Sequence, residues 1–352
     1  MRDSQSPAKW ESQSIGFLFL ISAHNEASFI RKTLLCIKQQ LSLQDAVVVI
    51  ADNCTDETAQ IAQAEGAKVL VRENDTNLGK SASLAWFASQ YAELIEQYLW
   101  TIVLDADSQI SDGFLPALRK IHLDEQQVYQ AFINPVYEIG TPLGKIAGLS
   151  ELNEQMTNQL YQRIYNFPIR LRGTGMIIPQ QVLLAYFPQL SSTVEDIELS
   201  LFLENGHVHV SSLYDLCVHD PKPRKADYLV NQRSRWIKGQ GRILWSHKGM
   251  IWRILICGPR TWPLLCSLFY KPKSLFVLMH IGLAVLFWRE NFLGWVFLIY
   301  PIWSAFLFLI GFLSIQNKID YLRALYTMPF FIILWIWSSF QSLWSTDWKK
   351  AR

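Results

Sequence analysis

The chain has 352 residues and a formal net charge of +2, so it can hold a sizeable domain plus an appendage, and no nucleic-acid partner is expected. Its five cysteines, an odd number without a C-x-x-C pair, argue against a disulfide framework or a zinc site and favour reduced thiols facing the cytosol. The 14 tryptophans belong to the residue type that favours a membrane–water boundary.

The first part of the chain alternates short apolar runs with segments of helical spacing. Residues 1–14 form a polar tail without the apolar core of a signal peptide, so we expect the next domain to stay in the cytoplasm. We then expect strands at 15–23, 46–52, 67–73 and 99–107, with helices at 29–41, 55–66 and 80–98. This alternation predicts an α/β fold with a mostly parallel sheet covered by helices on both faces.

Beyond residue 128 the alternation weakens. The pattern predicts a strand at 128–139, a helix at 147–167, a strand at 173–179, a helix and strand within 194–212 and a basic, aromatic helix at 225–245. We expect residues 15–248 to form one cytosolic domain.

The C-terminal part of the chain is mostly apolar. Residues 249–273 are apolar but interrupted by charges and prolines, which is typical of an amphipathic segment at the membrane surface. The apolar segments that follow are 275–288, 293–315 and 325–344, and the last two reach the roughly 20 residues of a spanning helix. We therefore expect about three transmembrane helices within 274–345 and a tail at 346–352. Three spans would put that basic tail outside, against the positive-inside tendency, so their number stays open.

Polar side chains follow three of the expected strands, at the sheet edge where such folds bind ligands. They are His24, Asn25, Glu26, Asp52, Asp105 and Asp107. The two carboxylates of the D-x-D sequence can hold a divalent cation that bridges to a diphosphate, or they can cap the next helix.

Other residues near these strand ends suit a nucleotide. Asp52 can accept a hydrogen bond from a base N–H. Lys80 stands at an expected helix start, where an ammonium and backbone N–H groups favour phosphate, although a surface lysine is common at such a position.

A second acidic group opens the helix expected after residue 193. Glu195, Asp196 and Glu198 all lie there, and one of them can act as a general base, while acidic residues also favour a helix N-terminus without any chemistry. The preceding glycine turn at Gly173–Gly175 can let a substrate approach the backbone.

The basic helix carries the most distinctive group. Gln232, Arg235 and Trp236 share one face by i, i+3, i+4 spacing. Arg235 can bind phosphate oxygens with two N–H groups, and Trp236 offers a flat apolar ring to a sugar. We expect Arg233, Lys238 and Arg242 to contact lipid headgroups.

In this order, the motifs resemble glycosyltransferase family 2, in particular its membrane-integrated branch of cellulose, chitin and hyaluronan synthases. The resemblance covers residues 15–245, with Asp52–Asn53 replacing a pair of acids and Val194 replacing a threonine. It implies a glycosyltransferase A-type, Rossmann-like fold and an inverting reaction that forms a β-glycosidic bond.

The resemblance also implies site roles. The donor would contact His24, Asn25, Glu26, Asp52, Lys80, Asp105, Gln232 and Arg235. The acceptor would contact Gly173, Thr174, Gly175 and Trp236. Asp105 and Asp107 would hold Mg²⁺ or Mn²⁺, and Asp196, next to Glu195, would be the catalytic base.

The expected function is transfer from a UDP-sugar to a growing polysaccharide or a lipid-linked glycan by a multi-pass inner-membrane enzyme. Membrane lipids, a second copy of the chain and an export partner are further expected partners. The alternatives are transfer of one sugar to a polyprenyl-linked acceptor and a non-catalytic membrane scaffold.

Overall fold

The computed structural model describes residues 16–74, 76, 78–136, 142–222, 226–257, 261–269, 273–290, 292–313 and 318–344. The tails expected at 1–14 and 346–352 lie outside these residues.

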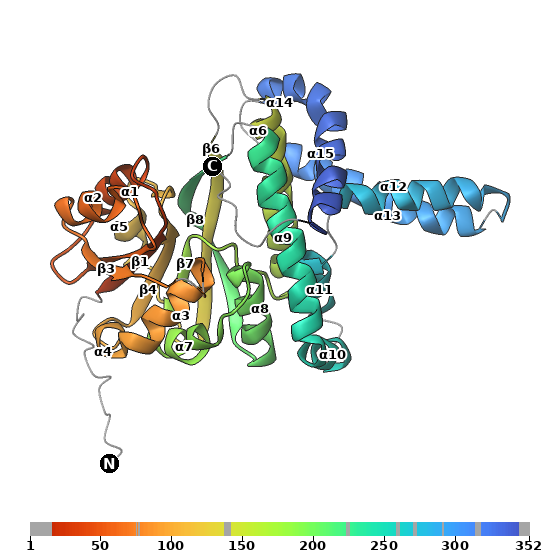
Figure 1. The fold of residues 1–352 in the computed structure, drawn as a ribbon. Coiled ribbons are helices and arrows are strands. Elements are labelled where there is room, and N and C mark those ends of the chain that lie inside the picture. The colour runs from red at the N-terminus through yellow and green to blue at the C-terminus, as the bar shows by residue number, and fades with distance from the viewer. Residues whose placement is uncertain are drawn as a thin grey trace, which may run out of the picture.

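Four parallel strands form the first half of the sheet (Figure 1). They are β1 (Phe17–Ala23), β2 (Ala46–Asp52), β3 (Lys68–Arg72) and β4 (Trp100–Asp105), joined by α1 (Ile30–Lys38), α2 (Thr58–Ala64), α3 (Lys80–Gln90) and α4 (Ala92–Ile95). In the register, Leu20 of β1 lies beside Val48 of β2 and Val103 of β4. The carboxyl ends of these strands therefore meet at one edge of the sheet.

The second half makes the sheet mixed. Its elements are β5 (Gln109–Ile110), α5 (Phe114–Leu118), β6 (Gln127–Val136), β7 (Met176–Pro179), α7 (Gln180–Tyr186), η1 (Phe187–Gln189), α8 (Glu195–Asn205) and β8 (His209–Pro221). The full strand order is β3-β2-β1-β4-β7-β6-β8-β5. β7 runs antiparallel to both β4 and β6, whereas β8 is parallel to β6.

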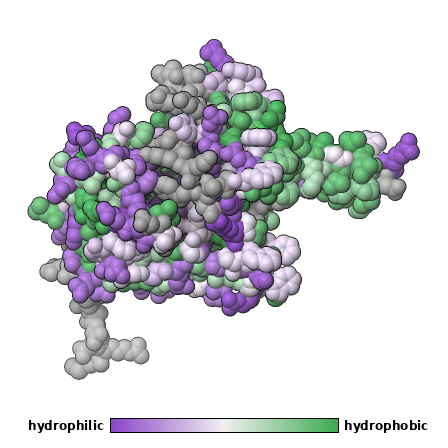
Figure 2. All heavy atoms as spheres, viewed as in Figure 1, coloured by the Kyte–Doolittle hydropathy of each residue, from purple (hydrophilic) through white to green (hydrophobic). Residues whose placement is uncertain are grey.

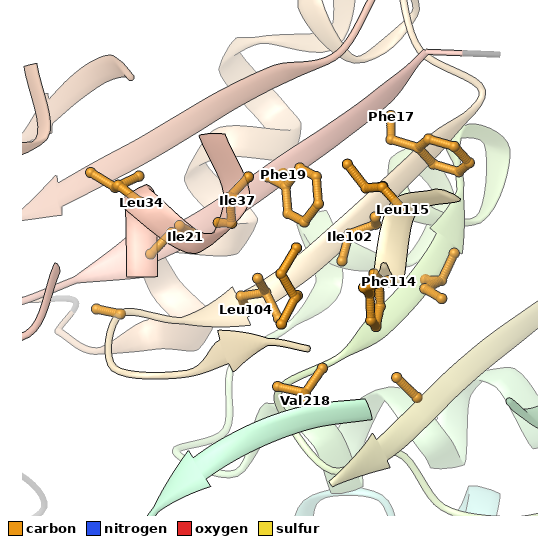
Figure 3. Close-up of a cluster of buried hydrophobic side chains, with 14 of the residues drawn as sticks. Phe17, Phe19, Ile21, Leu34, Ile37, Ile102, Leu104, Phe114, Leu115 and Val218 are labelled. Carbon is orange, nitrogen blue, oxygen red and sulfur yellow. The ribbon is translucent and has the colours of Figure 1, made fainter. Parts of the chain in front are cut away.

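The period of two in β1 divides the core between the two faces of the sheet. Phe17, Phe19 and Ile21 pack with α1 and α5 on one face (Figure 3). Leu18 and Leu20 pack on the other face against residues of α3 and α7. A strand buried on both faces has to be apolar throughout, which explains the continuous apolar run.

A group of helices from the middle and the end of the chain packs beside the sheet (Figure 1). They are α6 (Pro142–Tyr165), α9 (Ala226–Ser246), α10 (Lys248–Cys257), α11 (Trp262–Phe269), α14 (Lys318–Ala324), η4 (Leu325–Thr327) and α15 (Met328–Gln341). α6, α9 and α15 lie side by side (Figure 1). The Ser234 hydroxyl of α9 donates to the Ser338 carbonyl of α15 at 3.0 Å, which fixes this contact.

An apolar hairpin projects from the body of the molecule. It consists of α12 (Lys273–Leu286), η3 (Trp288–Glu290) and α13 (Phe292–Leu313), and Figure 2 shows its hydrophobic surface. Among the described residues, two helical segments are long and apolar enough to cross a membrane, namely 292–313 and 321–341, with a shorter apolar helix at 275–286. Exposed apolar surface of this extent marks a site of membrane or protein contact.

Some local expectations differ from the structure. The helix expected at 80–98 breaks at Tyr91, whose φ of −124° leaves the helical region and whose ring stacks on Phe87 at 5.7 Å. The short elements β5, α5 and α7 were not expected. The run at 46–52 is observed as β2 with the same bounds.

Candidate active site

A cavity of about 1090 Å³ lies at the carboxyl edge of the sheet and continues between the C-terminal helices. Its walls come from the ends of β1, β2 and β4, the start of α3, the segment before β7, the start of α8, and α9. Beyond them, the cavity is lined by residues of α6, α13 and α15. One hollow thus joins the edge of the sheet to the apolar helices.

Most of the site residues expected from the sequence line this cavity. These are His24, Glu26, Asp52, Lys80, Asp105, Asp107, Gly173, Thr174, Glu195, Asp196, Gln232, Arg235 and Trp236. Asn25 and Gly175 are not among its lining residues. The side-chain oxygen Oδ1 of Asn25 instead accepts hydrogen bonds from the Thr55 and Asp56 backbone N–H groups, so it shapes the loop beside the cavity.

Asp52 is held at the end of β2 by an ion pair. Its side chain is only 3% exposed and pairs with Arg72, which occupies the facing position on β3. A hydrogen bond of 2.7 Å joins His24 Nδ1 to the Asp52 carbonyl oxygen and ties the end of β1 to the same place. These contacts give the end of the cavity a fixed geometry.

Lys80 connects three segments at the centre of the cavity. Its Nζ lies 2.5 Å from Asp105 Oδ1, 3.0 Å from Glu195 Oε1 and 2.6 Å from the Gly173 carbonyl oxygen. Burial lowers the pKa of Lys80, but the charges of Asp105 and Glu195 raise it more, so its pKa lies above the ordinary value and the group stays charged. Lys80 therefore joins the D-x-D pair to the start of α8.

The D-x-D pair lies at the end of β4. The Asp105 N–H donates to the Thr174 hydroxyl at 3.1 Å, and that hydroxyl donates to Ser108 at 3.0 Å. Among the described residues, no three His, Cys, Asp or Glu side chains group closely enough to hold a metal ion. A cation held by Asp105 and Asp107 would need additional ligands from a bound substrate.

The three acidic residues of α8 have different surroundings. Burial raises the pKa of Glu195, as do the charges of Asp196 and Asp105, while Lys80 lowers it. The Asp196 carboxylate lines the cavity and accepts a 2.9 Å hydrogen bond from the Ile197 N–H. Glu198 is fully buried and accepts hydrogen bonds from the backbone N–H groups of Ser191 and Ser192. The candidates for a base are thereby reduced to Glu195 and Asp196.

The two glycines before β7 have different surroundings. Both have a positive φ, +78° at Gly173 and +68° at Gly175. A Cβ at Gly175 would meet Val218 at 3.1 Å and Ala131 at 3.2 Å, so this position is packed within the sheet. At Gly173, the nearest atom would be Glu195 Oε1 at 3.4 Å, beside the cavity.

Helix α9 supplies one wall of the cavity. Gln232, Arg235 and Trp236 all line it, and the buried Arg235 Nε has no hydrogen-bond partner. Arg233 was expected to contact lipid headgroups from the surface of α9, but it does not lie at the surface. Its side chain is buried against α15, with its guanidinium 4.2 Å from the Phe331 ring and 4.4 Å from the Trp335 ring.

The sequence reasoning missed several charged residues of the cavity. They are Glu151, Glu154, Arg170, Arg172, Asp220 and Lys222. Lys222 lies 2.5 Å from both Glu151 and Asp220. Asp220 lies near the end of β8 and Lys222 directly follows this strand, whereas the strand expected from the sequence ended at residue 212, so these two residues were not seen as a strand end.

Comparisons with known proteins concern the family and the fold of the chain. Residues 19–176 match the family described as Glycosyl transferase family 2. A search of curated protein sequences finds no match.

Among solved structures, the chain is similar to the mannosyltransferase PcManGT from Pyrobaculum calidifontis in complex with GDP-Man and Mn²⁺. The identity is 13% and the TM-score 0.55, over 93% of this chain and 87% of that chain. It is also similar to glucosyl-3-phosphoglycerate synthase from Mycobacterium tuberculosis in complex with Mn²⁺, UDP and phosphoglyceric acid, at 17% identity and a TM-score of 0.40, over 62% and 74% of the two chains. TarS 1-349 of S. aureus in complex with UDP-GlcNAc has 15% identity and a TM-score of 0.41, over 60% of each chain. The likeness to the mannosyltransferase confirms the expected fold class.

Proposed function

Residues 19–176 place this chain in glycosyl transferase family 2, and from this premise we propose that it transfers a sugar from a UDP-sugar to a hydroxyl acceptor with inversion. The chain is a glycosyltransferase with a nucleotide-sugar donor. One observation carries the finer proposal. The residues expected to bind the donor, to hold the metal ion and to act as the base come from separate segments, and they line one cavity.

The donor lies along the carboxyl edge of the sheet in this proposal. The uridine contacts His24, Glu26 and Asp52, with Asn25 shaping the adjacent loop. Gln232 and Arg235 bind the diphosphate, and the partnerless Arg235 Nε supports this role because a guanidinium binds phosphate oxygens through N–H groups.

A divalent cation, Mg²⁺ or Mn²⁺, fits between the D-x-D pair and the donor. Asp105 and Asp107 both line the cavity, and Mg²⁺ is commonly held by one or two carboxylates plus substrate phosphates. When bound, the cation would neutralise charge that develops on the departing UDP. Lys80, paired with Asp105, adds a fixed positive charge on the same side.

The transfer is one displacement at the anomeric carbon. Asp196 takes the proton of the acceptor hydroxyl as its oxygen forms the new bond, and the bond from the anomeric carbon to the diphosphate breaks. An α-linked donor thus gives a β-linked product. Glu195 holds Lys80 in place, while Trp236 lies under the acceptor sugar, near the turn at Gly173 and Thr174.

The site faces the cytoplasm at the inner membrane in this proposal. Residues 15–248 form the cytosolic domain, 249–273 lie at the interface, and the helices within 274–345 cross or enter the bilayer. The two segments of spanning length support this arrangement. The acceptor is a growing polysaccharide or a lipid-linked glycan.

Transfer of a single sugar to a lipid-linked acceptor is the second candidate. Its support is the continuation of the cavity between α6, α13 and α15, which would give a lipid direct access from the bilayer. The length of the product separates this reaction from polymer synthesis.

The test is release of UDP or GDP by the purified full chain with Mn²⁺ and a panel of UDP-sugars and GDP-sugars, followed by mass spectrometry of the product. We expect turnover with a UDP-sugar and loss of turnover with EDTA. Turnover of GDP-sugars alone would remove UDP as the donor nucleotide, and no turnover with any donor would favour a scaffold.

A further inference from the structure

Arg233 is a buried cation that the transfer reaction does not use. The residue is 4% exposed, and its Nη1 is buried without a hydrogen-bond partner. It lines the cavity on the side of α15, where Phe331 and Trp335 hold its guanidinium. A buried donor left unsatisfied is costly, and an anion bound beside Arg233 would satisfy it.

The neighbouring carboxylates already have partners. Glu151 is the carboxylate whose charge acts on Arg233, and it lies 2.5 Å from Lys222. Burial lowers the pKa of Arg233 to about 9, so the group is still cationic at neutral pH. Arg172, which lines the same cavity, also has a buried Nη2 without a hydrogen-bond partner. Two guanidinium groups thus have N–H donors for an anion.

Beside Arg233, the cavity becomes apolar. The lining residues there include Ile146 of α6, Phe308 of α13, and Met328, Phe331 and Trp335 of α15. α13 and α15 belong to the two segments long and apolar enough to cross a membrane. A ligand in this part of the cavity can therefore keep a hydrocarbon chain among apolar side chains while its polar head stays near Arg233.

We propose that this part of the cavity binds a lipid phosphate: Arg233 and Arg172 hold the phosphate, and the apolar side chains of α6, α13 and α15 hold the chain. Guanidinium groups suit this role because their N–H donors match phosphate oxygens. This inference rests on the proposed function, since the bound lipid is the acceptor of the sugar.

The chemistry at the phosphate is binding only. The headgroup presents a hydroxyl to Asp196, which takes its proton, and the new bond joins that oxygen to the anomeric carbon as UDP leaves. No bond to the lipid phosphate forms or breaks. Arg172 lies near enough to Asp196 for the two charges to act on each other, which brings the phosphate and the base to the same region.

The test compares three probes on the purified full chain in maltoside micelles. Farnesyl phosphate carries a chain and a phosphate, farnesol only the chain, and inorganic phosphate only the anion. Affinities are measured by microscale thermophoresis. We expect farnesyl phosphate to bind about tenfold more tightly than either other probe, because a hydrogen bond to a charged group contributes about that factor.

The variants then assign the anion site. Arg233→Met should weaken farnesyl phosphate about tenfold and leave farnesol unchanged, whereas Arg31→Met, at an exposed position of α1 outside the cavity, should change neither. If Arg233→Met does not fold, as judged by circular dichroism and UDP binding, Arg172→Met and the charge-keeping Arg233→Lys replace it. Arg172→Met should then weaken farnesyl phosphate, and Arg233→Lys should weaken it less.

Three results would overturn the inference. If farnesol bound as tightly as farnesyl phosphate, the phosphate group would make no contribution to binding. If inorganic phosphate bound as tightly, the site would be one for free phosphate. Unchanged binding of farnesyl phosphate in Arg233→Met, or in Arg172→Met where that variant replaces it, would show that the guanidinium does not bind the phosphate. UDP release is measured separately, so failure of the transfer reaction is distinguishable from failure of lipid binding.

Discussion

Glu195 and Asp196 are adjacent at the start of one helix, yet their partners separate their roles. Glu195 lies 3.0 Å from the Lys80 ammonium, which ties its carboxylate to the D-x-D side of the cavity. Asp196 takes its hydrogen bond from the backbone of Ile197, so its other oxygen is available to a ligand in the cavity. A base must reach the acceptor hydroxyl, and this geometry favours Asp196.

Asp196→Asn should therefore lower sugar transfer by roughly 10²- to 10⁴-fold, the usual contribution of a general base. UDP binding should stay within about threefold, because the amide keeps the shape of the side chain and bears no direct role in holding the nucleotide. UDP release measures the first effect and a UDP titration the second. Asp215→Asn, at an exposed position of β8 outside the cavity, is the control. If Asp196→Asn kept most of its transfer activity, Asp196 would not be the base.

Trp236→Ala should damage acceptor use more than donor binding. The indole lines the cavity and packs partly against the cluster around Ile197 and Leu201, so the variant loses a flat apolar platform. We expect the KM for the acceptor to rise about tenfold or more, since truncating a buried Trp contact usually costs at least that much.

The matched control for this prediction is Trp245→Ala on the same helix, because Trp245 is 77% exposed. Steady-state kinetics with varied donor and varied acceptor give the two KM values. Equal rises in both would show that Trp236 supports the whole site and not the acceptor.

The turn before β7 makes a prediction at the scale of an element. Gly175→Ala and Gly113→Ala both place a Cβ at a positive φ, +68° and +73°, at a cost of about 1–2 kcal/mol. Only at Gly175 would that Cβ meet Val218 and Ala131, which adds about 1–3 kcal/mol of overpacking. Gly175→Ala should therefore have the lower Tm by differential scanning fluorimetry, and equal Tm values would contradict the packing argument.

The strands of the first half could be predicted because their burial is local and continuous. Residues 47–50 are all β-branched, and the range 46–52 that contains them is β2 as expected. The break at Tyr91 could not be predicted, since tyrosine is no helix breaker and residues 80–98 contain no glycine or proline. Short elements such as β5 depend on a partner more than a hundred residues away.

The residues of the site likewise fall into those that local sequence predicts and those that depend on distant contacts. His24, Asp52 and Asp105 follow predicted strands, and a parallel sheet brings such positions together without further information. Arg233 differs, because it stands among the motif residues of α9 and its burial depends on α15, about a hundred residues later. Local spacing indicates which residues share a helix face, and only the docked helix decides which of them are covered.

At the scale of the whole molecule, the catalytic domain and the apolar helices share one cavity. In α9, Gln232 and Arg235 line the cavity and Arg233 packs against α15, so a single helix contributes to both regions. An enzyme of this shape can take a soluble donor from one side and a membrane-bound acceptor from the other. That division of substrates requires the apolar helices to lie in the bilayer.

Insertion of α13 can be tested by placing one charge on it. Ile302 lies near the middle of the helix and is 60% exposed, and Val71 is 61% exposed on β3 of the catalytic domain. If α13 crosses the bilayer, Ile302→Glu places a carboxylate in hydrocarbon at a cost of about 2.5–3.5 kcal/mol or more, so less protein should stay with membranes after an alkaline carbonate wash. Val71→Glu adds the same charge in water and should leave the membrane-bound fraction unchanged. Equal retention of the two variants would mean that α13 is covered by protein or lies outside the bilayer, because only a hydrocarbon surrounding distinguishes the two positions.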